Sequence, residues 1–369
     1  MEWPVWFNMP LANPMSRVHN KKQSFAHKRS RRKTVLVIVI FALAIVLFGA
    51  GLVLFEDRLR QPEDLLGDSG EWGWNESGEE VRLKIGDSRV SYTDAIDAYL
   101  VIGTDATGTS PDAEKGFNGN MADFLMLLLV NRTNGRFGFV QLDRDTMMDV
   151  PVLDANGEEI GTSHEQLCIA HWYGQNEEQR NGNTVTAVSR LLGGLPIKGY
   201  YSINMKDMDR VNHAVGGVEV KIEDDLTSID PAMKPGAVVT LADDQVERYL
   251  RARMKVGDGT NISRMRRQRR YMQSLYSLVT GRLKENANYI NEIYDEISEV
   301  VDSDLPAREV SQLTAEIIHF ENLGFMTIDG ESQKGKASYD GEVHSEFYPD
   351  TESILRTLRE FTDLSDGWG

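Results

Sequence analysis

Two aspartates lie where the chain enters or leaves very apolar segments. Asp105 ends the segment AYLVIGTD, and Asp123 begins the segment DFLMLLLV. We expect these segments to be strands buried on both faces, and ligands gather outside the strand ends of such sheets. Two carboxylates there would suit Mg²⁺, which takes one or two of them together with substrate phosphate oxygens. The simpler alternative, which the local sequence alone favours, is that each aspartate caps a turn.

Arg144 follows the strand-like segment FVQL in the motif DRDT, between Asp143 and Asp145. One interpretation is a local ion pair, which contributes little if it is exposed. The other is an arginine that points into the same cleft as the two aspartates. The motif alone leaves both open.

A basic run at residues 249–271 holds eight Lys or Arg and one Asp, although the chain carries a formal net charge of −17. Side chains two apart diverge on a helix, so Arg251 and Arg253 can share a ligand only if the helix ends near Arg251. Arg264 and Gln268 share one helix face. Because the planar guanidinium donates two parallel hydrogen bonds, arginine suits phosphate. A phosphate cradle, a solvated helix face and a nucleic-acid patch all remain open.

An apolar segment of 22 uncharged residues, 34–55, follows a basic tail at residues 1–33 with eight Lys or Arg and one Glu. It would span about 33 Å as a helix, enough to cross a membrane. The basic tail places the N-terminus in the cytoplasm and the remainder of the chain outside it. The basic run then lies outside the cell, where envelope polymers are expected and nucleic acid is not. A cleaved signal peptide is the alternative.

The rest of the sequence predicts a mixed α/β domain at 81–290. An acidic stalk at 56–80 precedes it, and a C-terminal region at 291–369 follows, as an accessory layer or a separate module. Turn signals at Gly86-Asp87 and Asn134-Gly135 each predict a hairpin. The single cysteine, Cys168, allows no intrachain disulfide and fits a buried apolar position. Helices are expected at HEQLCIAHWYG, at NTVTAVSRLLGGL, at TLADDQVERYLRAR with Thr240 as its cap, and from Arg264 onward.

The order of these motifs resembles the LytR-CpsA-Psr (LCP) family, also described as cell envelope-related transcriptional attenuators. The resemblance covers residues 98–283 through GTD, ADFLMLLLVN, RDT, AHWYGQ, GGVEV, YLRAR and GDGTNISRMRRQR. It implies a mixed central sheet flanked by helices, with an apolar groove for a polyprenyl chain. The implied activity is a membrane-anchored extracytoplasmic phosphotransferase. Such enzymes move a glycopolymer, such as a teichoic acid or capsular polysaccharide, from a polyprenyl-pyrophosphate carrier onto peptidoglycan with the help of Mg²⁺.

The same resemblance implies roles for individual residues. Asp105 and Asp123 correspond to the metal-site carboxylates. Arg144 corresponds to a catalytic, phosphate-binding arginine, and Asp145 beside it, or a metal-site carboxylate, would accept the proton of the incoming sugar hydroxyl. The pyrophosphate would be held by Arg144 together with four further side chains: Arg251, Arg253, Arg264 and Gln268.

Three departures distinguish this chain from the family pattern. Met121 stands where many members carry Arg, Asn261 stands where many carry Asp, and QLDRDT replaces S-x-P-R-D-T. Met121 and Asn261 keep one alternative open, a non-catalytic envelope module that binds lipid-linked polymer. The older family name suggests another, a regulator or attenuator of envelope genes acting through residues 1–33. The first predicts binding without turnover, and the second predicts DNA binding by a tail too short to bury a core.

Overall fold

The computed structural model describes residues 79–105, 121–253, 256–257, 259–286, 299–305, 319–336 and 343–367, together with isolated positions between 289 and 341. The predicted basic tail, the apolar segment 34–55 and nearly all of the predicted stalk lie outside the described residues. Among the helices that are described, none is long and apolar enough to cross a membrane.

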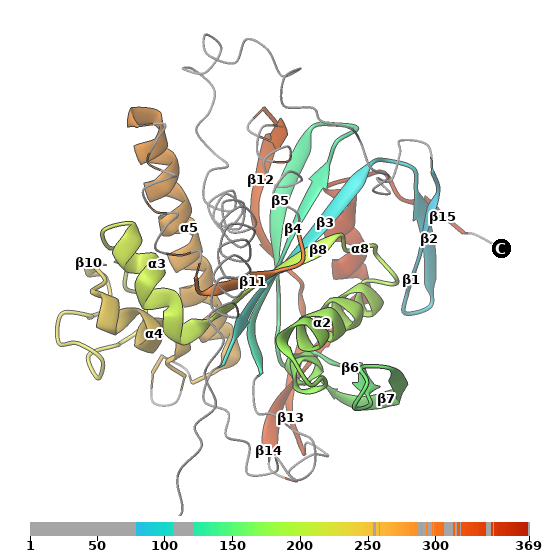
Figure 1. Ribbon diagram of the computed structural model, residues 1–369, viewed down its shortest axis with the longest axis horizontal. Coiled ribbons are helices and arrows are strands. Elements are labelled where there is room, and N and C mark those ends of the chain that lie inside the picture. Colours follow the sequence, from blue (N-terminus) through green and yellow to red (C-terminus); the bar gives the residue numbers. More distant parts are fainter. Residues whose placement is uncertain are drawn as a thin grey trace, which may run out of the picture.

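A six-stranded mixed sheet forms the centre of the molecule (Figure 1). β3 runs parallel to β8 and β5 runs parallel to β12, whereas the other neighbouring pairs are antiparallel. The predicted mixed α/β fold with a central sheet is confirmed. In spatial order the strands are β11 (Val301–Ser303), β8 (Gly199–Asn204), β3 (Ile96–Thr104), β4 (Ala122–Asn131), β5 (Arg136–Leu142) and β12 (Glu321–Thr327).

The two central strands, β3 and β4, are buried at every position. Successive side chains of a strand point to opposite faces, so each strand feeds two cores. Leu100 and Leu127 pack into the core on one face, whereas Tyr99 and Met126 pack into the core on the other. This explains why both segments are apolar throughout rather than alternating. The predicted hairpin turn joins β4 to β5, with Gly135 at a φ of +66°.

Helices cover both faces of the sheet (Figure 1). On one face lie α3, α4 and α5, and on the other lie α2, α8 and the small sheet β1-β2-β15. The helices on the first face are η4 (Met205–Asp207), α3 (Met208–Ala214), α4 (Asp243–Arg251) and α5 (Asn261–Glu285), beside the hairpin β9 (Glu219–Lys221) and β10 (Val238–Thr240). On the second face are η3 (Leu167–Trp172), α2 (Glu177–Leu191), α8 (Thr351–Arg359), β1 (Val81–Ile85), β2 (Ser88–Tyr92) and β15 (Ser365–Asp366).

Two further hairpins, β6-β7 and β13-β14, extend from the same edge of the molecule (Figure 1). An isolated bridge between Thr146 and Phe347 joins β14 to the chain just before β6. The β13-β14 hairpin therefore packs beside the DRDT segment. The four strands are β6 (Met147–Leu153), β7 (Glu159–Gln166), β13 (Gly330–Lys336) and β14 (Val343–Pro349).

Two local predictions were wrong. The segment HEQLCIAHWYG is not one helix, because His164 to Gln166 pair with β6 as the end of β7 and only η3 turns, as a 3-10 helix. Thr240 ends β10 and does not cap α4. The side chain of Gln245 instead accepts a hydrogen bond from the Ala242 N–H at the start of α4, at 3.0 Å.

The C-terminal region is continuous with the central fold. β11 and β12 are the two edge strands of the six-stranded sheet, and β15 pairs with β2. The leucines and isoleucine of α8 lie in the same core as β3 and β4. The predicted division at residue 290 therefore does not coincide with a break in the sheet.

Candidate active site

Three of the predicted site residues lie at one edge of the central sheet. Asp105 follows the end of β3, Asp123 lies at the start of β4, and Arg144 follows the end of β5. Because β4 is antiparallel to both neighbours, its beginning lies beside their ends. The sheet thus brings together residues that the sequence only suggested to be near strand ends.

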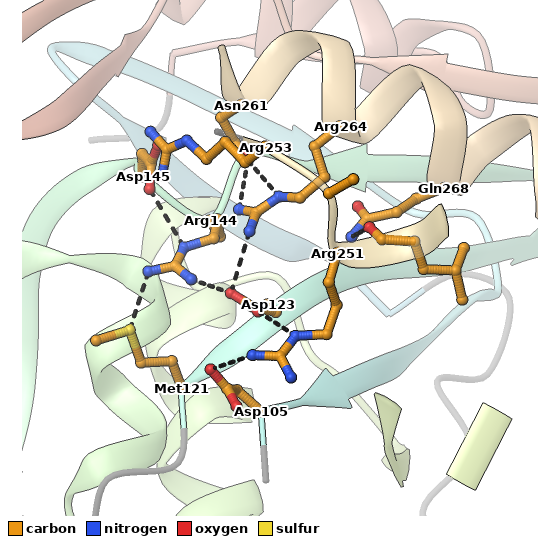
Figure 2. A network of polar contacts seen from close by, with 12 residues as sticks. Asp105, Met121, Asp123, Arg144, Asp145, Arg251, Arg253, Asn261, Arg264 and Gln268 are labelled. Atoms are coloured by element: carbon orange, nitrogen blue, oxygen red, sulfur yellow. Dashed lines mark hydrogen bonds and ion pairs between the residues drawn. The ribbon is translucent and has the colours of Figure 1, made fainter. Parts of the chain in front are cut away.

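Arg144 forms both of the contacts that were considered for it. Its Nε lies 3.2 Å from Asp145 Oδ1, which is the local ion pair. Its Nη1 also forms a close ion pair with Asp123 Oδ1 across the site, and its Nη2 lies 3.0 Å from the sulfur of Met121 (Figure 2). The side chain is almost completely buried, so both carboxylates help to offset the cost of burying its charge.

Both arginines of the R-x-R motif at residues 251–253 reach the site because α4 ends at Arg251 and the chain is extended after it. Arg251 Nη2 lies 2.9 Å from Asp105 Oδ2, and its Nε lies 4.0 Å from Asp123 Oδ2. Arg253 Nη2 lies 3.5 Å from Asp145 Oδ2. The two side chains therefore approach the same site from positions two apart, as an extended segment allows.

Arg264 enters the site from the first turn of α5, which begins after Thr260 accepts a hydrogen bond from the Ser263 N–H. Its Nη1 lies 3.6 Å from Asp123 Oδ1. Its Nε and Nη2 both donate to Asn261 Oδ1, at 3.0 and 2.5 Å. Figure 2 shows Arg144, Arg251 and Arg264 converging on the Asp123 carboxylate. Arg264 is 5% exposed, so the guanidinium is held almost entirely by protein groups.

Gln268 lies on the same buried face of α5 but does not join this network. Its Oε1 accepts from Gln141 at 3.4 Å, and its Nε2 donates to the backbone oxygen of Leu250 at 3.4 Å. It links α5 to β5 and α4 beside the arginines. Its predicted role toward pyrophosphate stays a prediction.

Sequence reasoning missed Arg267, which is buried on α5 although neighbouring Arg266 is exposed. Arg267 Nη1 forms an ion pair with Asp224 Oδ2 at 2.6 Å. Its Nη2 donates to the backbone oxygen of Ala252, the residue between the two arginines of the R-x-R motif. The local sequence could not have predicted this role, because no local pattern pairs Arg267 with Asp224, which lies far from it in the chain.

It also missed Asp143 as a member of the site. Asp143 Oδ1 accepts from Asn261 Nδ2 at 2.5 Å and from the Asp145 N–H at 2.9 Å. Its position one residue before Arg144, at the end of a buried strand, was an available signal.

Charge and burial set the proton affinities of these groups. Burial alone would raise the pKa of Asp123, but the charges of Arg144, Arg264 and Arg251 outweigh it and the pKa lies below its ordinary value. Burial lowers the pKa of Arg264. Four arginines (Arg144, Arg251, Arg253 and Arg264) thus surround three carboxylates (Asp105, Asp123 and Asp145), each of which pairs with at least one of them. An anionic ligand would complete this arrangement of charges.

Asp105 and Asp123 have donor atoms that suit Mg²⁺. Within the described part of the chain, no three His, Cys, Asp or Glu side chains gather into a metal-binding group. Mg²⁺ does not require one, because it usually takes one or two carboxylates with waters and substrate phosphate oxygens. The pair therefore fits Mg²⁺ bound together with a phosphorylated substrate, and the metal itself stays a prediction.

An apolar cavity of about 80 Å³ lies between the central sheet and helices α3 to α5. Gly103, Phe124, Leu250 and Gln268 contribute to its wall. Each of the first three stands within two residues of Asp105, Asp123 or Arg251 in the chain. The cavity and the charged network are therefore adjacent parts of one site.

Comparison with known proteins gives concordant findings. A family model described as the LytR_cpsA_psr family matches residues 76–356. The polyisoprenyl-teichoic acid–peptidoglycan teichoic acid transferase TagU of Enterococcus faecalis is 26% identical over 260 residues, which cover 70% of this chain and 74% of that protein.

Solved structures show the same fold. B. subtilis TagV matches with a TM-score of 0.52 and 20% identity, over 72% of this chain and 96% of that chain. A structure of TagT bound to LIIa-WTA matches with a TM-score of 0.51 and 16% identity, over 73% of this chain and 89% of that chain.

Proposed function

Because this chain belongs to the LytR_cpsA_psr family, we propose that it is a phosphotransferase of cell wall assembly that moves a glycopolymer from a polyprenyl-pyrophosphate carrier onto peptidoglycan. The relative that is named as a teichoic acid transferase supports a cell wall polymer transferase of LCP type. The TagT structure bound to LIIa-WTA supports a lipid-linked wall teichoic acid as the class of donor.

The observation that carries the proposal is the adjacency of four arginines and an apolar cavity. A polyprenyl pyrophosphate joins a dense anion to a purely apolar chain, so its site must offer cations on one side and apolar side chains on the other. Arg251 provides the first and its neighbour Leu250 the second.

The cavity of about 80 Å³ is too small for a polyprenyl chain, since an apolar cavity that binds the much smaller benzene molecule measures about 150 Å³. Met205, Met208 and Met272 belong to its wall. Methionine is unbranched and flexible and adapts to irregular shapes. We therefore infer that the chain of the lipid enters by displacing these side chains rather than by filling a preformed tunnel.

The chemistry needs positioning and charge neutralisation more than covalent participation by the protein. Arg144, Arg253 and Arg264 would bind the phosphate oxygens and stabilise the negative charge that develops on them during transfer. Asp105 and Asp123 would hold Mg²⁺, which when bound neutralises phosphate charge. The buried ion pairs fix these side chains before the substrate binds, so little reorganisation accompanies the reaction.

Residues 34–55 would anchor the enzyme as a single membrane-spanning helix, with the basic tail in the cytoplasm and the main domain outside. This arrangement would put the site on the side where lipid-linked polymers and peptidoglycan meet. It stays a proposal on the sequence alone.

Lipid binding and transfer by the full-length chain in detergent test the proposal. We expect a polyprenyl-pyrophosphate-linked saccharide to bind and its saccharide to be transferred to peptidoglycan together with the phosphate that carries it. Arg144→Ala and Arg251→Ala should abolish binding. Arg248→Ala is the matched control, because Arg248 lies on α4 three residues before Arg251 and its side chain is 52% exposed. Normal binding by both site variants would refute the proposal.

Binding without transfer would favour the alternative of a non-catalytic module. One observation favours that alternative: the neutral sulfur of Met121 contacts Arg144, so this position adds no positive charge to the site. Transfer that depends on Mg²⁺ and disappears in Asp105→Ala would exclude it.

A further inference from the structure

Asp143 differs from the other carboxylates of the site in its partners. Asp105, Asp123 and Asp145 each form an ion pair with at least one arginine. Among the described residues, the Asp143 carboxylate has only neutral donors as direct partners, the Asn261 amide and a backbone N–H. A guanidinium partner favours the charged form of a carboxylate and makes it a poor proton acceptor, whereas neutral donors do so less.

The two neutral donors both bind Oδ1 of Asp143, at 2.5 and 2.9 Å. Its other oxygen, Oδ2, accepts no hydrogen bond from the described residues and is not sealed from solvent. The residue as a whole is only 6% exposed. Asp143 therefore offers one free oxygen from an otherwise buried carboxylate.

Asn261 fixes this arrangement. Its Oδ1 accepts two hydrogen bonds from Arg264, so its NH₂ group must face Asp143, since the reversed amide would place NH₂ against the guanidinium. Arg264 in turn lies 3.6 Å from Asp123. The free oxygen is thereby held in a defined place relative to the arginine network.

The surroundings of Asp143 also give it a suitable proton affinity. Burial and the negative charge of Asp145 raise the pKa of Asp143 to about 6, against the lowering effects of the Asp145 N–H, Asn261 and Arg144. Arg264, on α5, lies beyond the Asn261 amide. A general base works best when its pKa lies near the working pH.

We propose that Asp143 is the general base that accepts the proton of the attacking hydroxyl, an assignment that rests on the proposed function. The acceptor O–H bond breaks as its proton passes to Asp143 Oδ2. The hydroxyl oxygen forms a bond to the phosphorus that carries the glycopolymer. The bond from this phosphorus to the bridging oxygen of the pyrophosphate breaks, and its electron pair leaves with the lipid phosphate.

This assignment replaces the earlier expectation for Asp145. Both Asp145 oxygens face arginines, and Oδ1 also accepts from Gln166 at 3.1 Å. Asp145 is therefore a positioning residue that holds Arg144 and Arg253. Loss of Asp143 should therefore affect proton transfer, whereas loss of Asp145 should affect binding of the lipid-linked saccharide.

The test measures transfer and lipid binding separately in the full-length chain. Asp143→Asn keeps the contact with Asn261 but removes the base, so kcat should fall by about 10²- to 10⁴-fold while the Kd for the lipid-linked saccharide is unchanged. In the unaltered chain kcat/KM should fall below about pH 6, and this limb should be absent from the residual activity of the variant. Asp143→Glu, which retains a carboxylate, should keep part of the rate.

Two further variants complete the comparison. Asp149→Asn is the matched control, because Asp149 lies in the same segment with its side chain 72% exposed, and it should leave the rate unchanged. Asp145→Asn should weaken lipid binding. It should keep an acid limb that lies at lower pH, because the variant lacks the negative charge that helps to raise the pKa of Asp143.

A near-normal rate in Asp143→Asn would overturn the assignment. So would a loss of lipid binding as large as that in Arg144→Ala. An acid limb that is lost altogether in Asp145→Asn, rather than moved to lower pH, while binding is intact would also overturn it. Absence of transfer by the unaltered chain is a different result. It would overturn the proposed function, and the assignment with it.

Discussion

At the scale of single residues, side chain types could be predicted but their pairings could not. The local sequence predicted that Asp105 and Asp123 lie at strand ends and that arginine side chains suit phosphate. That Asp123 lies within 4.0 Å of three arginines depends on the antiparallel register of β3, β4 and β5 and on where α4 ends. Local sequence left the conformation at Arg251 open for that reason.

The raised pKa of Asp143 leads to a prediction about stability. The folded chain binds this proton with a pKa of about 6, whereas an unperturbed aspartate has a pKa of about 3.9. Because the folded state binds the proton more tightly, the ionised carboxylate destabilises the fold above pH 6, and this penalty disappears as the pH falls toward about 4. Asp143→Asn should therefore raise the free energy of unfolding by about 2–3 kcal/mol at pH 8.

Chemical unfolding followed by circular dichroism at about pH 4 and pH 8 measures this difference. The variant should gain stability at the higher pH and very little at the lower one. An equal gain at both would show that the carboxylate is not the origin of the effect. This result does not depend on any enzymatic activity.

At the scale of elements, the prediction succeeded where burial decides the local pattern. The uniformly apolar β3 and β4 and the turns at Gly86 and Gly135 fold as expected. The helix predicted at residues 164–174 was wrong because the first of these residues pair with β6 as part of β7. Pairing between strands here overrides a local helical pattern. The parallel pairing of β12 with β5 joins segments far apart in the chain, and no local pattern specifies it.

The end of α4 depends on Arg267, which leads to a second prediction. Arg267→Met leaves the largely buried Asp224 without its arginine and removes the donors to the backbone of Tyr249 and Ala252. We expect a loss of about 3 kcal/mol in the free energy of unfolding. Binding of inorganic pyrophosphate should also weaken, because Arg251 and Arg253 would no longer be held in place.

Arg270→Met is the matched control on the same helix. Arg270 pairs with Glu223, with side chains 32% and 42% exposed, so its loss should cost about 0–1 kcal/mol and leave pyrophosphate affinity unchanged. Calorimetric titration with pyrophosphate and urea unfolding provide the two readouts. Unchanged affinity in Arg267→Met would mean that the R-x-R segment is positioned by other contacts.

At the scale of the whole molecule, the site and the C-terminal region depend on each other. The backbone N–H of Phe347 donates to the Asp145 carbonyl at 2.8 Å. Gln166 Nε2 donates both to Asp145 Oδ1 and to the Ser345 carbonyl, at 3.1 and 2.6 Å. β14 thus supports the DRDT segment from outside the central sheet. The sequence placed these residues in a separate region because their contacts are made across a separation of about two hundred positions.

A chain that ends at residue 290 should therefore fail to fold. It would lack both edge strands of the central sheet and the helix α8. The core loses Ile354, Leu355, Leu358 and Phe361, all of which are buried. At about 1.5–3 kcal/mol for each such side chain, this loss alone approaches the whole stability of a typical domain, about 5–15 kcal/mol.

Urea unfolding followed by circular dichroism gives the test, with a chain that ends at residue 367 as the control. The control keeps β15 and should unfold cooperatively with the midpoint of the intact chain. The shorter chain should show no cooperative transition, because the removed strands and helix belong to the same cooperative unit as β3 and β4. A cooperative transition at the normal midpoint would instead mean that residues 291–369 are an appendage to a domain that folds without them.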